Sequence, residues 1–243
     1  MELIQLKKDL LAHMLARNVI RTAESPDKFF KFKSGRMSPN FFNLGILNSG
    51  KDLSLLSKSL AQFTLEMQKQ GKLSSFQHVF GPAYKGIPLA TALGIGLNEL
   101  GLDVGVMYDR KEEKGHGDPS ADKIIMGSHA FKPGDSILMV DDVVTTGGTK
   151  VDALEKLKLL GEHKLAGLVL IVDRQEKMGG IGTAEDPIGE KSAVESLQEA
   201  GIKTFSLLNA QDVFDACKPM ISDSVKQSWV EYYDKYGAVR LMG

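Results

Sequence analysis

Residues 137–149 read Ile-Leu-Met-Val-Asp-Asp-Val-Val-Thr-Thr-Gly-Gly-Thr, and this stretch decides the fold of the 243-residue chain. Its apolar beginning predicts a buried strand over 136–140, and the apolar spacing that follows predicts a helix over 149–160. A turn rich in glycine and threonine joins the two. The stretch is therefore a strand whose carboxyl end opens into a helix N-terminus, which is where open α/β sheets bind their ligands.

The turn has the composition of a phosphate-binding site. Its glycines allow backbone N–H groups to converge, its threonine hydroxyls add donors, and the helix dipole favours an anion. Asp141 and Asp142 stand just before the turn, and because like charges repel they suit sugar hydroxyls or a magnesium shell rather than phosphate. Acids beside such a turn predict a ribose 5-phosphate site. The alternative is an ordinary strand-to-helix turn with two acids on the surface. The acid pair alone would favour that alternative, but the Thr-Thr-Gly-Gly-Thr run beside it favours the ribose 5-phosphate site.

Composition narrows the class of protein. The chain carries 30 Lys and Arg residues against 31 Asp and Glu residues, so no overall charge favours binding to nucleic acid or to an anionic membrane. No apolar run approaches the roughly 20 residues that a membrane helix needs. The only cysteine is Cys217, which excludes an internal disulfide and favours a reducing compartment. We therefore expect a soluble cytoplasmic enzyme.

Strand-like and helical patterns alternate along the chain. Strands are predicted at 77–80, 103–108, 136–140, 166–172 and 203–208, and helices at 3–16, 51–69, 87–100, 149–160 and 221–236. This alternation predicts an α/β fold with a central parallel sheet and helices on both faces. An edge hairpin is expected around Ser34-Gly35, and residues 115–122 and 178–189 are expected to form exposed loops.

Two further segments carry cations where a phosphate ligand would need them. In residues 80–86, Lys85 lies among glycines after a strand, and lysine is a compact point charge suited to phosphate. Residues 109–118 are rich in charge and contain two glycines that can act as hinges, so this loop can close over a leaving pyrophosphate and exclude water. The alternatives are an exposed lysine in a Gly-Pro turn and a solvated run of charges.

Taken in order, these motifs resemble those of the orotate phosphoribosyltransferase family, which are type I phosphoribosyltransferases that use 5-phosphoribosyl-1-pyrophosphate (PRPP). The resemblance runs from about Lys33 to Glu176 and includes a hood motif, Lys-Ser-Gly-Arg-Met-Ser-Pro, at 33–39. It implies a Rossmann-like central parallel sheet flanked by helices, with a small N-terminal hood. It also implies a single domain over 1–243, in which the hood takes roughly 1–45 plus C-terminal elements and the core roughly 46–210.

The resemblance implies a role for each candidate residue. Those implied as catalytic are Lys111, Lys114, His116, Asp141 and Asp142. PRPP would be bound by the same five and by Lys33, Tyr84, Lys85, Arg110, Val143, Val144, Thr145, Thr146, Gly147, Gly148 and Thr149. Orotate would be bound by Lys33, Phe41, Phe42, Thr145 and Arg174. Orotate is a planar pyrimidine with a carboxylate, so aromatic rings can hold its ring and a guanidinium can bind its carboxylate. The alternatives are core packing for the phenylalanines and an ion pair with Asp173 or Glu176 for Arg174.

The implied activity is transfer of ribose 5-phosphate from PRPP to orotate, giving orotidine 5'-monophosphate and pyrophosphate, a step of pyrimidine nucleotide synthesis. Mg²⁺ is the implied cofactor, held through PRPP and water rather than directly by the protein. The family's mobile loop serves the neighbouring subunit, which implies a homodimer, with no nucleic acid or membrane partner. The chain departs from the family pattern at Met37 and Asn40, where a lysine and a tyrosine are expected, and in an expanded segment at 178–190.

Two other functions are compatible with a PRPP site. A purine or uracil phosphoribosyltransferase would keep the fold and change the acceptor, but Arg174 and the hood motif argue against it. A regulator that binds PRPP without catalysis would need a nucleic-acid-binding module, and the sequence contains no basic recognition helix. Consumption of orotate in the presence of PRPP and magnesium distinguishes the orotate enzyme from both of these alternatives.

Overall fold

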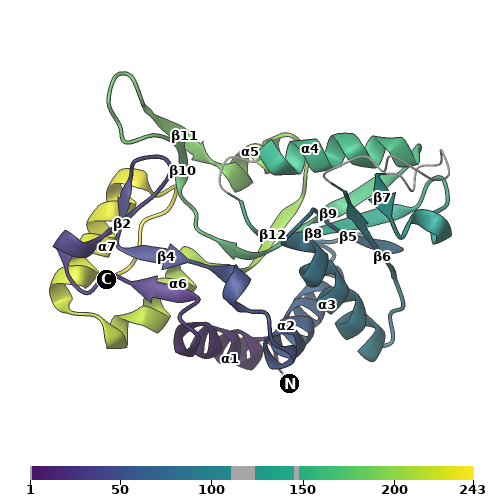
Figure 1. Ribbon diagram of the computed structural model, residues 1–243, viewed down its shortest axis with the longest axis horizontal. Helices are drawn as coiled ribbons and strands as arrows, with labels where there is room; N and C mark the ends of the chain where they lie inside the picture. The colour runs from purple at the N-terminus through teal and green to yellow at the C-terminus, as the bar shows by residue number, and fades with distance from the viewer. Residues whose placement is uncertain (1, 111–123, 145–147) are drawn as a thin grey trace.

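The computed structural model describes residues 2–110, 124–144 and 148–243. A six-stranded sheet in the order β12-β9-β8-β5-β6-β7 lies at its centre (Figure 1). Its strands are β5 (His78–Gly81), β6 (Gly105–Asp109), β7 (Ile125–Met126), β8 (Ser136–Val143), β9 (Lys164–Asp173) and β12 (Thr204–Asn209). All neighbouring pairs are parallel except β6 and β7, which are antiparallel. The predicted parallel α/β sheet is confirmed, with one short antiparallel strand added at its edge.

Helices cover both faces of this sheet. In Figure 1, α4 (Gly148–Leu157) and α5 (Ala193–Glu199) lie above it, and α2 (Gly50–Lys69) and α3 (Gly86–Glu99) lie below. Side chains alternate along β8 because successive residues of a strand point to opposite faces. Leu138 and Val140 belong to the cluster packed on α2 and α3, whereas Ile137 and Met139 belong to the cluster packed on α4 and α5.

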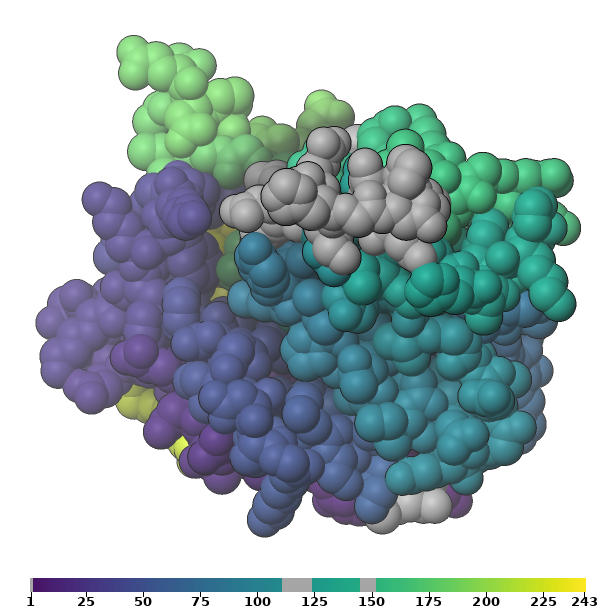
Figure 2. Space-filling model, turned by 45° about the vertical axis from the view of Figure 1, so that its right-hand side comes forward, coloured from purple at the N-terminus to yellow at the C-terminus, as the bar shows by residue number. Residues whose placement is uncertain are grey.

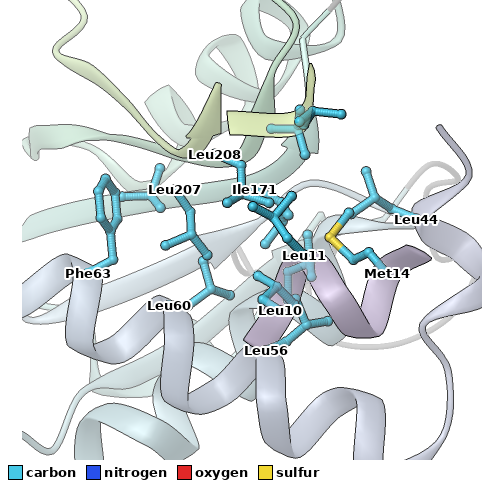
Figure 3. Packing of buried hydrophobic residues seen from close by; sticks show 14 of the residues in the cluster. Leu10, Leu11, Met14, Leu44, Leu56, Leu60, Phe63, Ile171, Leu207 and Leu208 are labelled. Atoms are coloured by element: carbon cyan, nitrogen blue, oxygen red, sulfur yellow. The ribbon is translucent and has the colours of Figure 1, made fainter. Parts of the chain in front are cut away.

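Helix α1 (Leu3–Ala16) packs on α2 through leucine and methionine side chains. In Figure 3, Leu10 lies beside Leu56 of α2 and Met14 lies beside Leu44, beneath the sheet. The predicted helices at 3–16, 51–69, 87–100 and 221–236 are confirmed within two residues at each end. The predicted helix at 149–160 is α4 followed by a short 3-10 helix over Lys158–Leu160.

Asp52 joins the start of α2 to α1. It is the third helical residue after the N-cap Ser49, and the two residues exchange side-chain and backbone hydrogen bonds in a capping box. Its carboxylate also binds His13 Nε2 at 2.6 Å and Arg17 at 3.3 Å. The hydrogen bond from His13 and those from the Ser49 backbone hold the pKa of Asp52 well below its usual value, so this 1% exposed carboxylate stays charged.

The hood lies beside the sheet and is built from both ends of the chain. Its strands are β1 (Ile20–Thr22), β2 (Phe30–Lys31), β3 (Met37–Ser38) and β4 (Asn40–Phe42), which form the antiparallel pairs β1–β4 and β2–β3. The predicted hairpin around Gly35 is confirmed, and Gly35 adopts φ +79°, a conformation that favours glycine. Helices α6 (Ala210–Cys217) and α7 (Asp223–Tyr236) complete the hood from the C-terminal side.

The expected exposed loop at 178–189 is wrong in part, because its ends are strands. β10 (Lys177–Gly179) and β11 (Ile188–Ser192) pair antiparallel and form a hairpin that stands out beside the hood (Figures 1 and 2). The strands are short, irregular in register and rich in glycine and charge, so local periodicity does not mark them. A distant residue stabilises them: Arg36 donates to the carbonyl oxygens of Lys177, Met178, Gly179 and Gly180. The other expected loop, 115–122, lies outside the described residues.

No helix in the described ranges is both long enough and apolar enough to cross a bilayer.

Candidate active site

The two acids of the opening stretch end β8. The strand runs to Val143, beyond the predicted end at residue 140, so Asp141 and Asp142 are part of it and are 5% and 6% exposed. Lys85, at the N-terminus of α3, binds Asp142 Oδ2 at 2.8 Å. The first acid accepts the backbone N–H of the second at 2.8 Å, and the second accepts that of Val143 at 2.8 Å. Both carboxylates are therefore held in place at the carboxyl end of the central strand.

The pleat of β8 separates the two carboxylates. Asp142 continues the row of Leu138 and Val140, which faces α3, and this agrees with its contact to Lys85. Asp141 continues the row of Met139, which faces α4. The acids therefore flank the end of the strand, and a ligand placed over that end can reach both.

The predicted phosphate-binding turn is described only at its two ends. Val143 is half-buried and Val144 is buried. Thr145, Thr146 and Gly147 lie outside the described residues. Helix α4 begins at Gly148 and includes Thr149, as the strand-turn-helix prediction requires.

The predicted pyrophosphate loop follows β5 and is anchored by Asp109. Ala83 donates its N–H to Asp109 Oδ1 at 2.6 Å, and the Ala83–Tyr84 peptide is cis. Lys156 of α4 donates to Asp109 Oδ2 at 2.5 Å and to the carbonyl oxygen of Arg110 at 3.0 Å. Asp109 is 5% exposed. The buried carboxylate thus joins three elements, while Tyr84 and Lys85 remain exposed beside it.

The charged loop after β6 is described only at its first residues. Arg110 donates its backbone N–H to the carbonyl oxygen of Ile124 at 2.8 Å, and its Nε to Met126 Sδ at 3.0 Å. The remaining candidates of this loop, Lys111, Lys114 and His116, lie outside the described residues.

A cavity of about 510 Å³ opens between the hood, the hairpin and the ends of β8 and β9. Its lining includes the predicted base-site residues Lys33, Phe41, Phe42 and Arg174. The other lining residues are Lys31, Phe32, Ser34, Arg36, Val144, Asp173, Gln175, Glu176, Met178, Gly179, Ser192 and Ala193. The structure thus brings residues from the early part of the chain, such as Lys33, together with residues from its later part, such as Arg174. Val144, just after β8, lines the same cavity.

Arg174 lies between aromatic rings and an acid. Its guanidinium is 4.2 Å from the centre of the Phe32 ring and 5.9 Å from that of Phe42. Its Nη2 donates to Glu176, so the ion pair considered from the sequence is present. Its Nε is buried and has no hydrogen-bond partner among the described residues. Because a buried donor without an acceptor is costly, this atom marks a place where a ligand acceptor would be favourable.

Burial also sets the ionisation of the groups around the cavity. It raises the pKa of Asp173, whose Oδ1 accepts the N–H of Gln175 at 2.8 Å. Burial likewise raises the pKa of Tyr232 and of Tyr233, so both hydroxyls stay protonated. Tyr232 then donates to Glu176 Oε2 at 3.1 Å, and Tyr233 donates to the carbonyl oxygen of Arg174 at 2.9 Å.

Several residues of the site were not predicted to act in it. Asp109 and Lys156 hold the pyrophosphate loop, and Glu176, Tyr232 and Tyr233 hold the segment around Arg174. The sequence offered one signal for the first group, an acid placed at the end of a predicted strand. The sequence contains no such signal for Tyr232 and Tyr233, because their spacing indicates only the apolar face of a helix near the C-terminus.

Among the described residues, no group of three or more His, Cys, Asp or Glu side chains is placed to hold a metal ion.

Comparison with known proteins gives a consistent result. Residues 55–181 match the model of the phosphoribosyl transferase domain. The chain is 36% identical over 219 residues to an orotate phosphoribosyltransferase of Bifidobacterium adolescentis, covering 86% of this chain and 90% of that one. It is 37% identical over 213 residues to one of Metarhizium anisopliae, covering 86% and 88%. The crystal structure of an orotate phosphoribosyltransferase of Francisella tularensis superposes with a TM-score of 0.74 at 29% identity, covering 93% and 98%.

Proposed function

The chain belongs to the orotate phosphoribosyltransferase family, and from this premise we propose how its described residues divide the work of the reaction. The reaction transfers ribose 5-phosphate from PRPP to orotate and releases orotidine 5'-monophosphate and pyrophosphate, in pyrimidine nucleotide synthesis. We assign the end of β8 to PRPP and the cavity between hood and hairpin to orotate. The residue assignments, the magnesium ion, the dimer and the cellular location are all part of this proposal.

The environment of Arg174 carries the assignment of the base site. Its guanidinium lies on the aromatic side chains of Phe32 and Phe42, and its buried Nε–H has no acceptor within the part of the chain that the structure describes. A flat ring bearing a carboxylate supplies a face for the phenylalanines and an acceptor for that donor. Lys33 is exposed at the wall of the same cavity and adds a second positive charge. A purine or uracil has no carboxylate, so it would offer this donor only a neutral acceptor.

In the transition state, charges of opposite sign develop on the two sides of the bond between the ribose and the pyrophosphate, which breaks. The ribose becomes electron-poor and oxocarbenium-like, and the departing pyrophosphate gains negative charge. Asp141 and Asp142 are held where carboxylates can bind the ribose hydroxyls and stabilise the positive side. Lys85 lies beside them for the negative side. Arg110, Lys111, Lys114 and His116 are proposed to approach the pyrophosphate from the loop after β6.

We propose that Mg²⁺ binds to PRPP oxygens and water, where it would supply positive charge to the leaving group. The donors available at the end of β8 fit this arrangement, because Asp142 already holds Lys85 and the acids lie on opposite sides of the strand. Carboxylates so placed can accept hydrogen bonds from metal-bound water. The protein's own part is to fix the ribose and to receive the pyrophosphate.

We propose that the protein is a homodimer in which the loop after β6 completes the neighbour's active site. Large apolar side chains are exposed around α3, next to the pyrophosphate loop: Tyr84 is 65%, Ile95 54% and Leu100 49% exposed. Burying such side chains against a second copy is favourable. A contact made there would bring the neighbour's chain close to Lys85.

We also propose that residues 1–243 form one domain that works in the cytoplasm. One hydrophobic cluster extends from Leu10 in α1 to Leu241 near the C-terminus, which supports a common core for the hood and the sheet. Cys217 is fully buried, which suits a protein that relies on no disulfide.

The activity is tested by following the ultraviolet absorbance of orotate after adding the protein, PRPP and magnesium chloride. Loss of orotate absorbance that requires both PRPP and magnesium is the expected result. Parallel reactions with uracil, adenine and hypoxanthine test the other acceptors. Turnover of one of these bases without turnover of orotate would refute the assignment of the cavity.

Replacing Arg174 by alanine is expected to raise the KM for orotate roughly 30- to 150-fold, because a charge-assisted pair worth about 2–3 kcal/mol is lost. The KM for PRPP should change little, since the end of β8 is untouched. Steady-state kinetics with each substrate varied in turn measure both values. Arg240→Ala serves as the control, because that guanidinium is 92% exposed. An unchanged KM for orotate, or a raised KM for PRPP alone, would show that Arg174 does not bind the base.

A further inference from the structure

Glu176 is a buried acid next to a residue proposed to bind an anionic base. Its side chain is 12% exposed, and one oxygen pairs with Arg174 Nη2. The other oxygen accepts the hydroxyl of Tyr232 at 3.1 Å and lies 3.9 Å from Arg36 Nη1. A negative charge at this place repels a second carboxylate. If charge alone determined the affinity for orotate, the site would bind it more tightly without Glu176. The presence of this acid therefore needs another explanation.

The surroundings of Glu176 make it a rigid support. Arg36 is 4% exposed, and its guanidinium donates to four backbone carbonyls of the segment 177–180 at 2.8–3.2 Å. The same guanidinium lies 4.6 Å from the centre of the Tyr236 ring. The backbone of Glu176 pairs with that of Gly237 across an isolated bridge. The acid is therefore fixed between α7, the hood and the hairpin before any ligand binds.

Arg174, in contrast, needs a partner to fix its orientation. An arginine side chain has several rotatable bonds, and the faces of Phe32 and Phe42 restrain its plane but not its rotation within that plane. The bond to Glu176 occupies one amino group and so sets which edge remains for a ligand. Among the remaining donors is Nε, which has no partner in the described ranges of the chain.

We propose that Glu176 is a positioning residue for the base: it holds the Arg174 guanidinium in the orientation that binds the carboxylate of orotate. The proposal rests on the proposed function and assigns part of its specificity to an acid that does not itself touch the substrate. Tyr232 supports Glu176 from the opposite side through its hydroxyl.

Charge and shape can be separated at this position by two substitutions. Glu176→Gln keeps an oxygen that can accept from Arg174 and removes the charge, whereas Glu176→Ala removes both. If Glu176 positions Arg174, the alanine variant should raise the KM for orotate on the order of 10- to 100-fold, because misplacing a binding group by about 1 Å has that effect. The glutamine variant should stay within about fivefold of wild type, since it keeps a neutral hydrogen bond. The KM for PRPP should be unchanged in both.

The measurements are steady-state kinetics with each substrate varied and thermal unfolding of every variant. Glu190→Ala is the matched control, because it removes an exposed acid from β11 of the same hairpin. Tyr232→Phe removes only the hydroxyl that supports Glu176 and should raise the KM for orotate by less than Glu176→Ala does.

Three outcomes would overturn the proposal. A lower KM for orotate in both Glu176 variants would mean that Glu176 acts only as a repelling charge. A lowered unfolding temperature with an unchanged KM would mean that its role is only structural. Equal increases of the KM for orotate in the alanine and glutamine variants would mean that Glu176 does not act by positioning Arg174 through a hydrogen bond. Wild-type protein that does not consume orotate would instead refute the proposed function itself, which separates the two failures.

Discussion

Replacing Asp141 and Asp142 together by asparagine is expected to lower kcat/KM for PRPP on the order of 100- to 10,000-fold. The two carboxylates are proposed to bind ribose hydroxyls and to stabilise positive charge on the sugar in the transition state. Two charge-assisted hydrogen bonds worth about 1.5–3 kcal/mol each account for an effect of this size. Initial rates at varied PRPP and saturating orotate measure it.

The same double variant should fold. Asparagine keeps the side-chain oxygen that accepts the backbone N–H of the next residue, as each aspartate now does. The ion pair between residue 142 and Lys85 is lost, but the Lys85 side chain is 63% exposed, so water replaces the carboxylate at little cost. Circular dichroism and thermal unfolding check the fold, with Asp103→Asn, an exposed acid before β6, as the control. Normal PRPP turnover in a folded double variant would refute the assignment of the acid pair.

Mixing two inactive variants is expected to restore activity if the active site is shared between subunits. One variant carries Lys114→Ala and the other carries the double replacement at Asp141 and Asp142. In a mixed dimer with a shared site, one site collects both defects and the other collects neither. Random exchange makes half of the dimers mixed, so about a quarter of all sites should be complete. Activity of the mixture, followed over time under conditions that allow exchange, measures this recovery.

A loop that serves its own subunit gives a different result, because every site then carries one defect and mixing restores nothing. Exchange itself is confirmed by tagging one variant and recovering the other with it. Failure to regain activity after confirmed exchange would refute the shared site and leave the transferase reaction unaffected. Wild-type protein mixed with either variant provides the reference for the loss of activity by dilution.

The sheet and its helices could be predicted because each is encoded locally. A run such as Ile137–Val140 is apolar on both faces, and that pattern alone predicts a buried strand with layers on both sides. Asp141, Asp142 and Lys85 could be placed at one edge because strands and helices alternate regularly, which fixes where strand ends meet. The contact between Lys85 and Asp142, 57 positions apart, agrees with that reasoning.

The hairpin and the supports of the base site could not be predicted in the same way. β10 has three residues and follows no clear alternation, and its stability depends on Arg36, which lies more than 140 positions away. The support that Glu176 gives to Arg174 depends in turn on Tyr232, from the last helix. Interactions of this kind depend on where distant segments of the chain meet, and the spacing of apolar residues within a segment does not predict this.

The contacts of Arg36 have a consequence for how the molecule assembles. Arg36 is synthesised long before its carbonyl partners, which follow 141–144 positions later in the chain. Closing a loop of that length opposes the contact until other interactions have brought the segments together. The PRPP side of the site is built from β5, β8 and the start of α3, whereas the base side also needs α7 through Tyr232. Recognition of the base therefore requires a chain that has been made as far as α7, with segments from both ends of the chain brought together.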